Sequence, residues 1–161
     1  MQVVLENEAL KVTINSFGAE LASIRGKETD TEYLWNADAK FWKRSAPVLF
    51  PFVGSLKNKE YHYEGKAYPM GQHGFARDME FAVDVQMATE AWFSLRSNEE
   101  TKEKYPFEFI LKVGYELEGR RPKGHLAGGK SGYKNTVLFH RRTSRIHVSC
   151  EWKRKAVGIL F

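Results

Sequence analysis

The sequence predicts an all-β fold of antiparallel sheets with little helix and an irregular C-terminal tail. Several segments alternate apolar and polar residues with a period of two, short turn-forming stretches separate them, and no sustained helical period is present. The chain has 161 residues, of which 42% are hydrophobic and 14% aromatic. This composition excludes a disordered chain for most of its length and suits one domain with a buried core.

Three consecutive strands are predicted at the N-terminus. Residues 3–5 and 10–14 flank the polar turn at residues 6–8, and residues 19–24 alternate small or apolar side chains with polar ones. A short aromatic strand is expected at residues 32–35.

The next part combines an irregular segment with a hairpin. Residues 46–53 form an apolar run interrupted by Pro47 and Pro51, and prolines confine such a run to an edge or an irregular path. Residues 61–63 and 66–68 are joined by Glu-Gly, which is a hairpin signal.

Alternation then predicts three longer elements. Residues 79–86 and 91–96 alternate well, and residues 107–117 alternate over eleven positions, the clearest strand of the sequence. The polar stretch 98–104 between them fits a loop or one helical turn.

Residues 120–161 differ from the rest in charge and in pattern. They contain 11 basic residues and one acid, a net charge of +10, whereas residues 1–119 carry −5. Residues 137–139 and 146–148 are too short to read as core strands. We therefore divide the chain into a β-sandwich part, residues 1–119, and a basic tail, residues 120–161. Such a tail is also typical of nucleic-acid binding.

Several classes of protein are not expected. Cys150 is the single cysteine, so no internal disulfide forms, and no His or Cys spacing typical of a metal site occurs. The sequence has no apolar run long enough for a membrane helix and no secretory leader pattern. A reducing cytoplasm is the expected compartment.

The densest group of hydrogen-bonding side chains is Gln72, His73 and Arg77 in the segment GQHGFAR. An amide, an imidazole and a guanidinium within six residues are suited to several hydroxyls of one polar ligand. An ordinary surface loop is the alternative.

A second candidate is Arg44, two residues after Trp42. A stacking ring beside a guanidinium fork is a common way to hold a sugar. A β-edge whose arginine lays its stem on apolar surface is at least as compatible with the sequence.

Four segments resemble the aldose 1-epimerase (galactose mutarotase-like) family, in particular its bacterial branch of LacX-type proteins. The segments are LENEALKVTINSFGAELASI, EYLWNADAKFWKRSAPVLFPFVGSLKN, YEGKAYPMGQHGFARDMEF and YPFEFILKVGYELEG. They cover nearly all of residues 1–119 in order, and QHGFARD is the most specific. The resemblance implies a truncated β-supersandwich, because members of the family are much longer than this chain.

The resemblance also implies an activity: acid–base ring opening that interconverts the α and β anomers of a hexose or hexose phosphate, without cofactor or metal. Arg44 and Arg77 would hold hydroxyls or a phosphate, and Gln72 and His73 would complete the wall of the sugar site. Ser55 departs from the basic residue that the family often has at that place.

The catalytic acid of the family, a histidine in a His-Pro motif, and its base, a glutamate near the C-terminal end, have no counterpart here. None of the five histidines precedes a proline. No catalytic residue is therefore assigned, and we expect an isomerase-like chain that is inactive by itself.

A lost reading frame explains the tail. Codons that encode TVLFHRRTSRIHV, residues 136–148, can also encode LYFSIGGHPAFM when read one base later. This shifted peptide contains a His-Pro pair of the kind that the family has. We expect the frame to be lost near Gly119.

Two other functions stay open at this point. One is a carbohydrate-binding module without turnover, which would share the sugar-contacting residues. The other is a basic nucleic-acid-binding protein that acts through residues 120–161; the tail lacks stacking aromatics and a recognisable motif for it. The family resemblance otherwise predicts a small sugar as partner, with no specific nucleic acid and no membrane.

Overall fold

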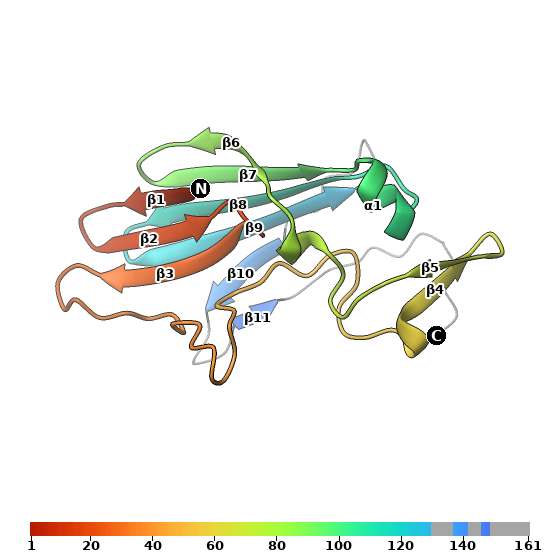
Figure 1. Cartoon of the computed structure of the whole chain (residues 1–161). Coiled ribbons are helices and arrows are strands. Elements are labelled where there is room, and N and C mark those ends of the chain that lie inside the picture. The colour runs from red at the N-terminus through yellow and green to blue at the C-terminus, as the bar shows by residue number, and fades with distance from the viewer. Residues whose placement is uncertain (130–136, 142–145, 149–161) are drawn as a thin grey trace.

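The computed structural model describes residues 1–129, 137–141 and 146–148. Three antiparallel sheets and a few short helical turns make up this part of the chain (Figure 1). The all-β prediction is confirmed. In the part of the chain that the structure describes, no helix is long and apolar enough to cross a membrane.

The small sheet contains β1 (Gln2–Glu6), β2 (Leu10–Asn15) and β3 (Glu20–Gly26) in that order. The three predicted N-terminal strands are confirmed, and β1 buries every second residue. The turn between β1 and β2 is stabilised by Asn7, whose side-chain oxygen accepts the backbone N–H groups of Ala9 and Leu10, each at 2.9 Å.

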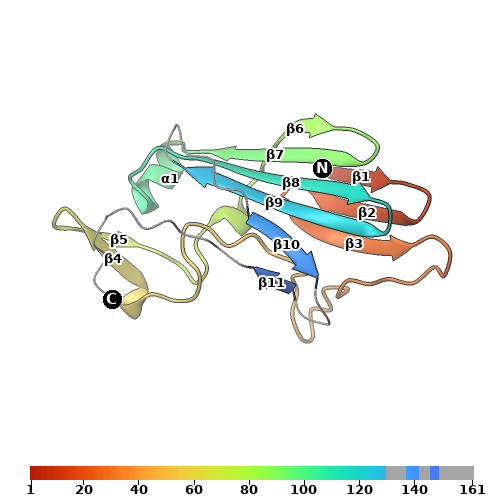
Figure 2. The same ribbon diagram turned by 180° about the vertical axis from the view of Figure 1, so that it is seen from behind.

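The large sheet has six strands in the order β11-β10-β9-β8-β7-β6. Their bounds are Ala82–Gln86 for β6, Glu90–Arg96 for β7, Ile110–Glu118 for β8, Arg121–Gly129 for β9, Val137–Arg141 for β10 and Ile146–Val148 for β11. Figure 2 shows β10 and β11 continuing the sheet beyond β9. Each strand pairs with the next one along the chain, which is a meander.

The sheet continues past Gly119, where the sequence analysis expects an irregular tail. Strand β9 pairs with β8 over nine residues. The basic side chains of β9 face acids of β8: Lys123 lies 2.7 Å from a carboxylate oxygen of Glu118, and His125 lies 3.4 Å from one of Glu116. The segments 137–139 and 146–148, judged too short for core strands, lie within β10 and β11. The rest of the tail lies outside the described residues, and a lost frame near Gly119 stays a prediction.

The hairpin of β4 (Glu60–Tyr63) and β5 (Lys66–Pro69) follows a 3₁₀ turn at Lys57–Lys59. Helix α1 (Glu99–Lys104) contacts β5 at the same end of the molecule (Figure 1). Asn98 and Thr101 form a capping box at its start, which explains why this polar stretch folds as one short helix.

The strand expected at residues 32–35 is wrong. Glu32 forms only an isolated bridge with Arg25. Its carboxylate accepts hydrogen bonds from Ser23 Oγ at 2.5 Å and from the backbone N–H groups of Ile24 at 2.8 Å and Leu34 at 3.0 Å. The side chain thus occupies backbone donors that a neighbouring strand would have used.

The expectation of an irregular path at residues 46–53 is confirmed. This segment contains a cis peptide between Phe50 and Pro51, and Phe50 forms an isolated parallel bridge with Gly74. The clearest predicted strand, residues 107–117, begins later, at Ile110 in β8. Tyr105 and Phe109 instead pack around the ring of Phe50, at centroid distances of 5.8 and 4.9 Å.

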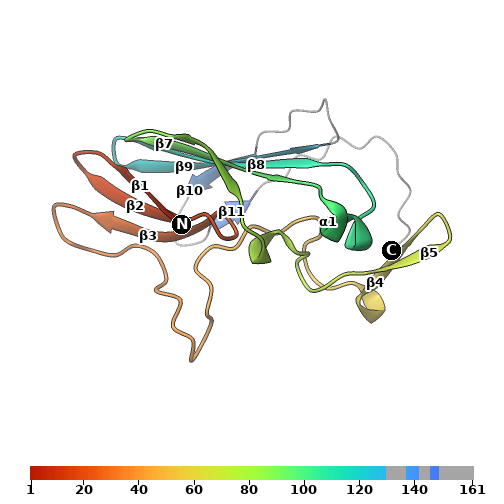
Figure 3. The same cartoon turned by 45° about the horizontal axis from the view of Figure 1, so that its top comes forward.

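The core lies between the small sheet and the large sheet (Figure 3). Fully buried side chains come from both layers: Val3, Leu5, Val12 and Ile14 from the small sheet, and Phe93, Leu111 and Val113 from the large one. The aromatic residues around Phe50 extend this core toward the segment that carries Gln72 and His73.

Candidate functional site

The segment that carries Gln72, His73 and Arg77 is fixed by backbone contacts with Phe50. The carbonyl of Phe50 accepts the N–H groups of Phe75 at 2.9 Å and Ala76 at 3.3 Å. Gly74 has φ +74, and a Cβ at this position would lie 2.0 Å from the Phe50 oxygen. Only glycine permits this close approach, so Gly74 decides the path of the loop.

His73 is clamped to Gly54 by two hydrogen bonds. Its backbone N–H donates to the Gly54 carbonyl at 2.8 Å, and its Nδ1 accepts the Gly54 N–H at 2.9 Å. A neutral imidazole that accepts at Nδ1 carries its proton on Nε2. His73 is half-buried and has φ +66, a left-handed conformation that is uncommon for a residue with a side chain. The clamp thus orients a ring whose second nitrogen can donate.

Arg77 is the middle residue of a 3₁₀ turn, Ala76–Asp78, and its side chain points back toward Gln72. Its Nη2 donates to the carbonyl of Gln72 at 2.9 Å, and its Nε lies 3.5 Å from a carboxylate oxygen of Asp78. Among the described residues, this Nε is the single buried side-chain polar atom without a hydrogen-bond partner. Arg77 therefore holds the Gln72 backbone in place.

Arg44 reaches the same segment from the connection between β3 and β4. One terminal nitrogen, Nη1, donates to the Arg77 carbonyl at 2.8 Å and to a carboxylate oxygen of Glu20 at 3.1 Å. The other, Nη2, donates to the Asp78 carboxylate. Both nitrogens are thus engaged by protein groups.

Glu20 completes this ion pair from the start of β3. Its second oxygen accepts the backbone N–H groups of Ser45 at 2.6 Å and Ala46 at 3.1 Å. The Glu20 side chain is 9% exposed and that of Arg44 19%. This buried, hydrogen-bonded pair anchors the connection onto the small sheet.

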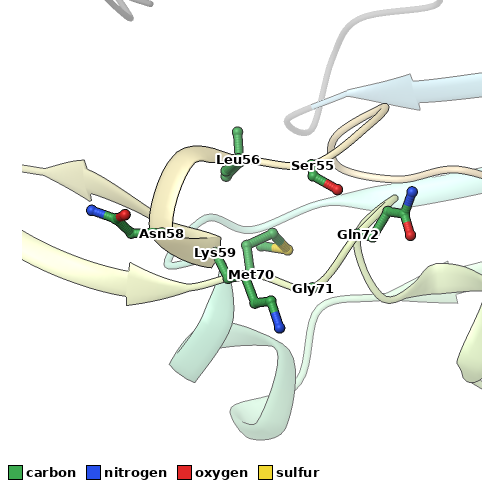
Figure 4. Close-up of a pocket in the computed structure, with 7 residues that line it drawn as sticks. All are labelled: Ser55, Leu56, Asn58, Lys59, Met70, Gly71 and Gln72. Atoms are coloured by element: carbon green, nitrogen blue, oxygen red, sulfur yellow. The ribbon is translucent and has the colours of Figure 1, made fainter.

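Gln72 opens onto a shallow pocket of about 510 Å³. Its lining residues are Ser55, Leu56, Asn58, Lys59, Met70, Gly71 and Gln72. Figure 4 shows Ser55 and Gln72 on one side of this pocket and Asn58 on the other. Hydroxyl, amide and ammonium groups, together with the apolar side chains of Leu56 and Met70, can bind a small polyhydroxylated molecule.

The structure therefore brings the four predicted residues into one region, in different roles. Arg77 and Arg44 are linked through the Arg77 carbonyl, and Arg77 is linked to Gln72 through the Gln72 carbonyl. Gln72 faces solvent, and His73 has one ring nitrogen engaged. Their part in sugar binding stays a prediction.

Sequence reasoning missed Glu20 and Gly54 as parts of this region. Glu20 lies in an alternating strand, where an acid is expected to face solvent, but in the structure the residue is buried, with 7% of its surface exposed. Gly54 has φ +87, a conformation that favours glycine. Within the described residues, no group of three or more His, Cys, Asp or Glu side chains is arranged to hold a metal ion.

Comparison with known proteins identifies the family. A model of the family "Aldose 1-epimerase" matches residues 1–136. The chain belongs to the aldose 1-epimerase family. The match extends beyond Gly119, the last residue of the four segments that resemble the family.

Two curated relatives of this epimerase-family chain come from one bacterium. It is 37% identical over 125 residues to the plasmid-borne protein LacX of Lactococcus lactis subsp. lactis, a match covering 74% of this chain and 42% of LacX. The chromosomal LacX of the same organism matches to the same extent. The chain thus spans less than half the length of the curated relatives it matches.

Solved structures of epimerase-family relatives share the fold. A galactose mutarotase related enzyme from Lactobacillus acidophilus superposes with a TM-score of 0.80 at 40% identity, over 86% of this chain and 46% of that one. A galactose mutarotase-like protein from Lactobacillus casei gives 0.79 at 37% identity, over 86% and 47%. The predicted galactose mutarotase-like fold is therefore confirmed.

Proposed function

We propose that residues 1–129 form the N-terminal, sugar-contacting part of a mutarotase that interconverts the α and β anomers of a hexose or hexose phosphate. The proposal rests on membership of the aldose 1-epimerase family and on one observation of the site. That observation is the pair of hydrogen bonds between His73 and Gly54, which fixes the ring of the residue that directly follows the pocket-lining Gln72.

In this proposal Gln72 and His73 contact the sugar directly. The Gln72 side chain makes no hydrogen bond within the described residues, so both its carbonyl and its amide can pair with hydroxyls. His73 Nε2 donates to a third oxygen. Arg77 and Arg44 already have carbonyl and carboxylate partners, and we assign both to positioning the loop. Their guanidinium N–H groups that make no hydrogen bond within the protein would contact the sugar.

We further propose that this polypeptide does not turn over sugar by itself. Mutarotation needs a base for the anomeric hydroxyl and an acid for the ring oxygen. The sequence holds no His-Pro pair, and Glu151, the one acid of residues 120–161, has no family-like neighbours. Binding without catalysis is the expected behaviour.

Polarimetry and ligand-observed NMR together test both parts. The purified chain is mixed with freshly dissolved α-D-glucose or α-D-galactose, and the decay of optical rotation is compared with buffer alone. Saturation-transfer NMR on the same samples reports binding. We expect a binding signal with an unchanged decay rate. A clear acceleration of the decay would contradict the absence of catalytic groups, and a missing binding signal would contradict the sugar site.

A non-catalytic carbohydrate-binding module is the second candidate. The exposed Gln72 in a pocket that mixes polar and apolar side chains favours it, because sugar binding alone needs neither a catalytic acid nor a catalytic base. This second candidate predicts that the chain binds one sugar selectively. It also predicts that no turnover appears when the family segments that the chain lacks are added. Nucleic-acid binding through residues 120–161 stays a separate prediction, tested by the salt dependence of DNA binding.

The cytoplasm is the compartment that we propose. Cys150 is the single cysteine, so the chain has no internal disulfide of the kind found in oxidising compartments. The free sugars on which the family acts also support this compartment. Fractionation of cells that express the chain tests this placement.

A further inference from the structure

An exposed aromatic loop lies in the connection between β3 and β4. We define this aromatic loop as residues 33–42. Four of the nine large apolar side chains that are most exposed among the described residues belong to it: Tyr33 at 52%, Trp35 at 41%, Phe41 at 80% and Trp42 at 50%. The connection leaves both sheets before it returns toward the hairpin of β4 and β5 (Figures 1 and 3).

The aromatic loop is held in one arrangement although it is exposed. The indole N–H of Trp35 donates to the Trp42 carbonyl at 2.8 Å, and the rings of Trp35 and Phe41 meet edge to face with centroids 6.2 Å apart. The carbonyl of Asp38 accepts the N–H groups of Phe41 at 3.0 Å and Trp42 at 2.9 Å. The loop is therefore pre-organised to present apolar surface, which lowers the entropic cost of covering it.

Monomeric proteins seldom leave such an apolar cluster uncovered, and a rigid aromatic patch marks a contact surface. The size of the relatives indicates what covers it. The Lactobacillus acidophilus and Lactobacillus casei structures retain this fold over 86% of the chain, yet the match accounts for only 46% and 47% of their own length. More than half of each relative must therefore lie against or beyond the surface of this fold.

We propose that the aromatic loop is the docking surface for this complementary half, the part of an aldose 1-epimerase-family chain that the match leaves uncovered. The loop leads directly into Arg44, which the Glu20 ion pair anchors beside the candidate site. A partner seated on Phe41 and Trp42 would thus contact the chain directly before Arg44, which hydrogen-bonds to the Arg77 carbonyl. The missing catalytic groups would have to be brought to the candidate site.

Co-expression tests the proposal with the full 161-residue chain. The probe is the complementary half of the Lactobacillus acidophilus relative, carrying an affinity tag, and the readout is the molar ratio of the two polypeptides after purification. We expect the wild-type chain to co-purify near one to one. The double variant Phe41→Ser, Trp42→Ser should lower the recovered ratio at least tenfold. Both side chains are exposed, so a circular-dichroism melt should show an unchanged fold.

Met87→Ser is the matched control, since Met87 is 61% exposed but lies in the turn between β6 and β7. It should leave the ratio unchanged. Equal loss with Met87→Ser, or no loss with the double variant, would overturn the proposal. So would light scattering that shows the chain alone forming a dimer dependent on Phe41 and Trp42, because a second copy would then be the occupant.

Failure of docking and failure of the proposed function are separable in this design. A co-purified complex that does not accelerate mutarotation supports the docking surface and contradicts the sugar chemistry. Sugar binding by the chain without any co-purification contradicts the docking surface alone.

Discussion

Arg44 donates a hydrogen bond from Nη1 to the main-chain carbonyl of Arg77, across 2.8 Å. The two arginines that the family resemblance assigns to the sugar are thus joined to each other, through a carbonyl 33 residues further along the chain. The same nitrogen also donates to the Glu20 carboxylate, and Nη2 donates to the Asp78 carboxylate. The Arg44 guanidinium therefore joins β3 to the segment that carries Arg77 and Asp78. Its removal should affect stability before it affects ligand binding.

The first prediction concerns this fork. Arg44→Ala leaves the buried Glu20 carboxylate without its charged partner, and we expect a loss of about 2–3 kcal/mol in the free energy of unfolding. Urea denaturation followed by tryptophan fluorescence measures it. Arg25→Ala is the control, because Arg25 forms an exposed ion pair with Asp30 and should cost no more than about 0.5 kcal/mol. Equal costs for the two variants would show that the Glu20 pair is no more than a surface contact.

The second prediction separates backbone strain from steric contact. Gly74 and Gly65 have nearly the same φ, +74 and +75, but a Cβ at Gly74 meets the Phe50 oxygen at 2.0 Å, whereas nothing lies within 4 Å of one at Gly65. Gly65→Ala should cost about 1 kcal/mol through left-handed strain alone. Gly74→Ala should cost more than about 3 kcal/mol, or prevent folding. Thermal and urea melts of the pair decide whether the Phe50 contact fixes the loop.

The third prediction tests the pocket. Gln72 is exposed and its side chain makes no hydrogen bond within the described residues, so Gln72→Ala should leave stability within about 0.5 kcal/mol. Loss of one hydrogen bond to a sugar should weaken binding roughly fivefold, or about 1 kcal/mol. Titration calorimetry with the sugar selected by NMR measures this. Gln86→Ala, at an exposed position of β6, should change neither quantity; unchanged affinity with Gln72→Ala would remove Gln72 from the site.

The fourth prediction concerns the pH dependence of stability through Glu32. Partial burial raises the pKa of Glu32, but the hydrogen bonds from Ser23, Ile24 and Leu34, with the nearby charge of Arg25, lower it more, so the net pKa lies below its ordinary value. A carboxyl with a lowered folded-state pKa contributes stability above its ordinary pKa of 4.5. That contribution is lost as the pH falls through the folded-state pKa.

Urea denaturation at pH 6 and pH 3 provides the measurement. Glu32→Gln should destabilise the protein clearly at pH 6 and less at pH 3, because pH 3 lies below the ordinary pKa of 4.5 and part of the wild-type contribution is lost there. Glu8→Gln is the control, since the exposed Glu8 side chain makes no hydrogen bond within the described residues, and it should change little at pH 6. The same loss for Glu32→Gln at both values would show that shape, not charge, matters at this position.

The fifth prediction concerns the reading frame. We expect the nucleotide sequence that encodes residues 120–161 to give the family's His-Pro motif when read one base later, with a glutamate codon further downstream. Sequencing of the gene across this region is sufficient to test it. A shifted frame that soon meets stop codons, or that encodes no such motif, would leave the basic tail as a native segment. Binding assays on nucleic acid would then take precedence.

The strands, their buried faces and the hairpin followed from the sequence because these features depend on neighbours one to four residues away. The polar turn at residues 6–8 predicted β1 and β2 on either side of it, alternation predicted β7, and Glu-Gly predicted the turn between β4 and β5. Four segments together, of which QHGFARD is the most specific, indicated the family. All of these properties depend on residues that are close together in the sequence.

Only the tertiary structure determined which side chains already have hydrogen-bond or ion-pair partners within the protein. Glu20 and Arg44 are 24 residues apart, and Arg44 and Asp78 are 34 apart, so no local pattern could pair them. The same limitation explains the failed strand at residues 32–35, where the Glu32 carboxylate reaches across to Ser23 and Ile24. Hydrogen-bond partners are chosen by proximity in space, and proximity exists only once the sheets have packed. For this reason the sequence by itself identified the family and the four candidate residues, whereas only the fold separated the exposed Gln72 from the two arginines that support it.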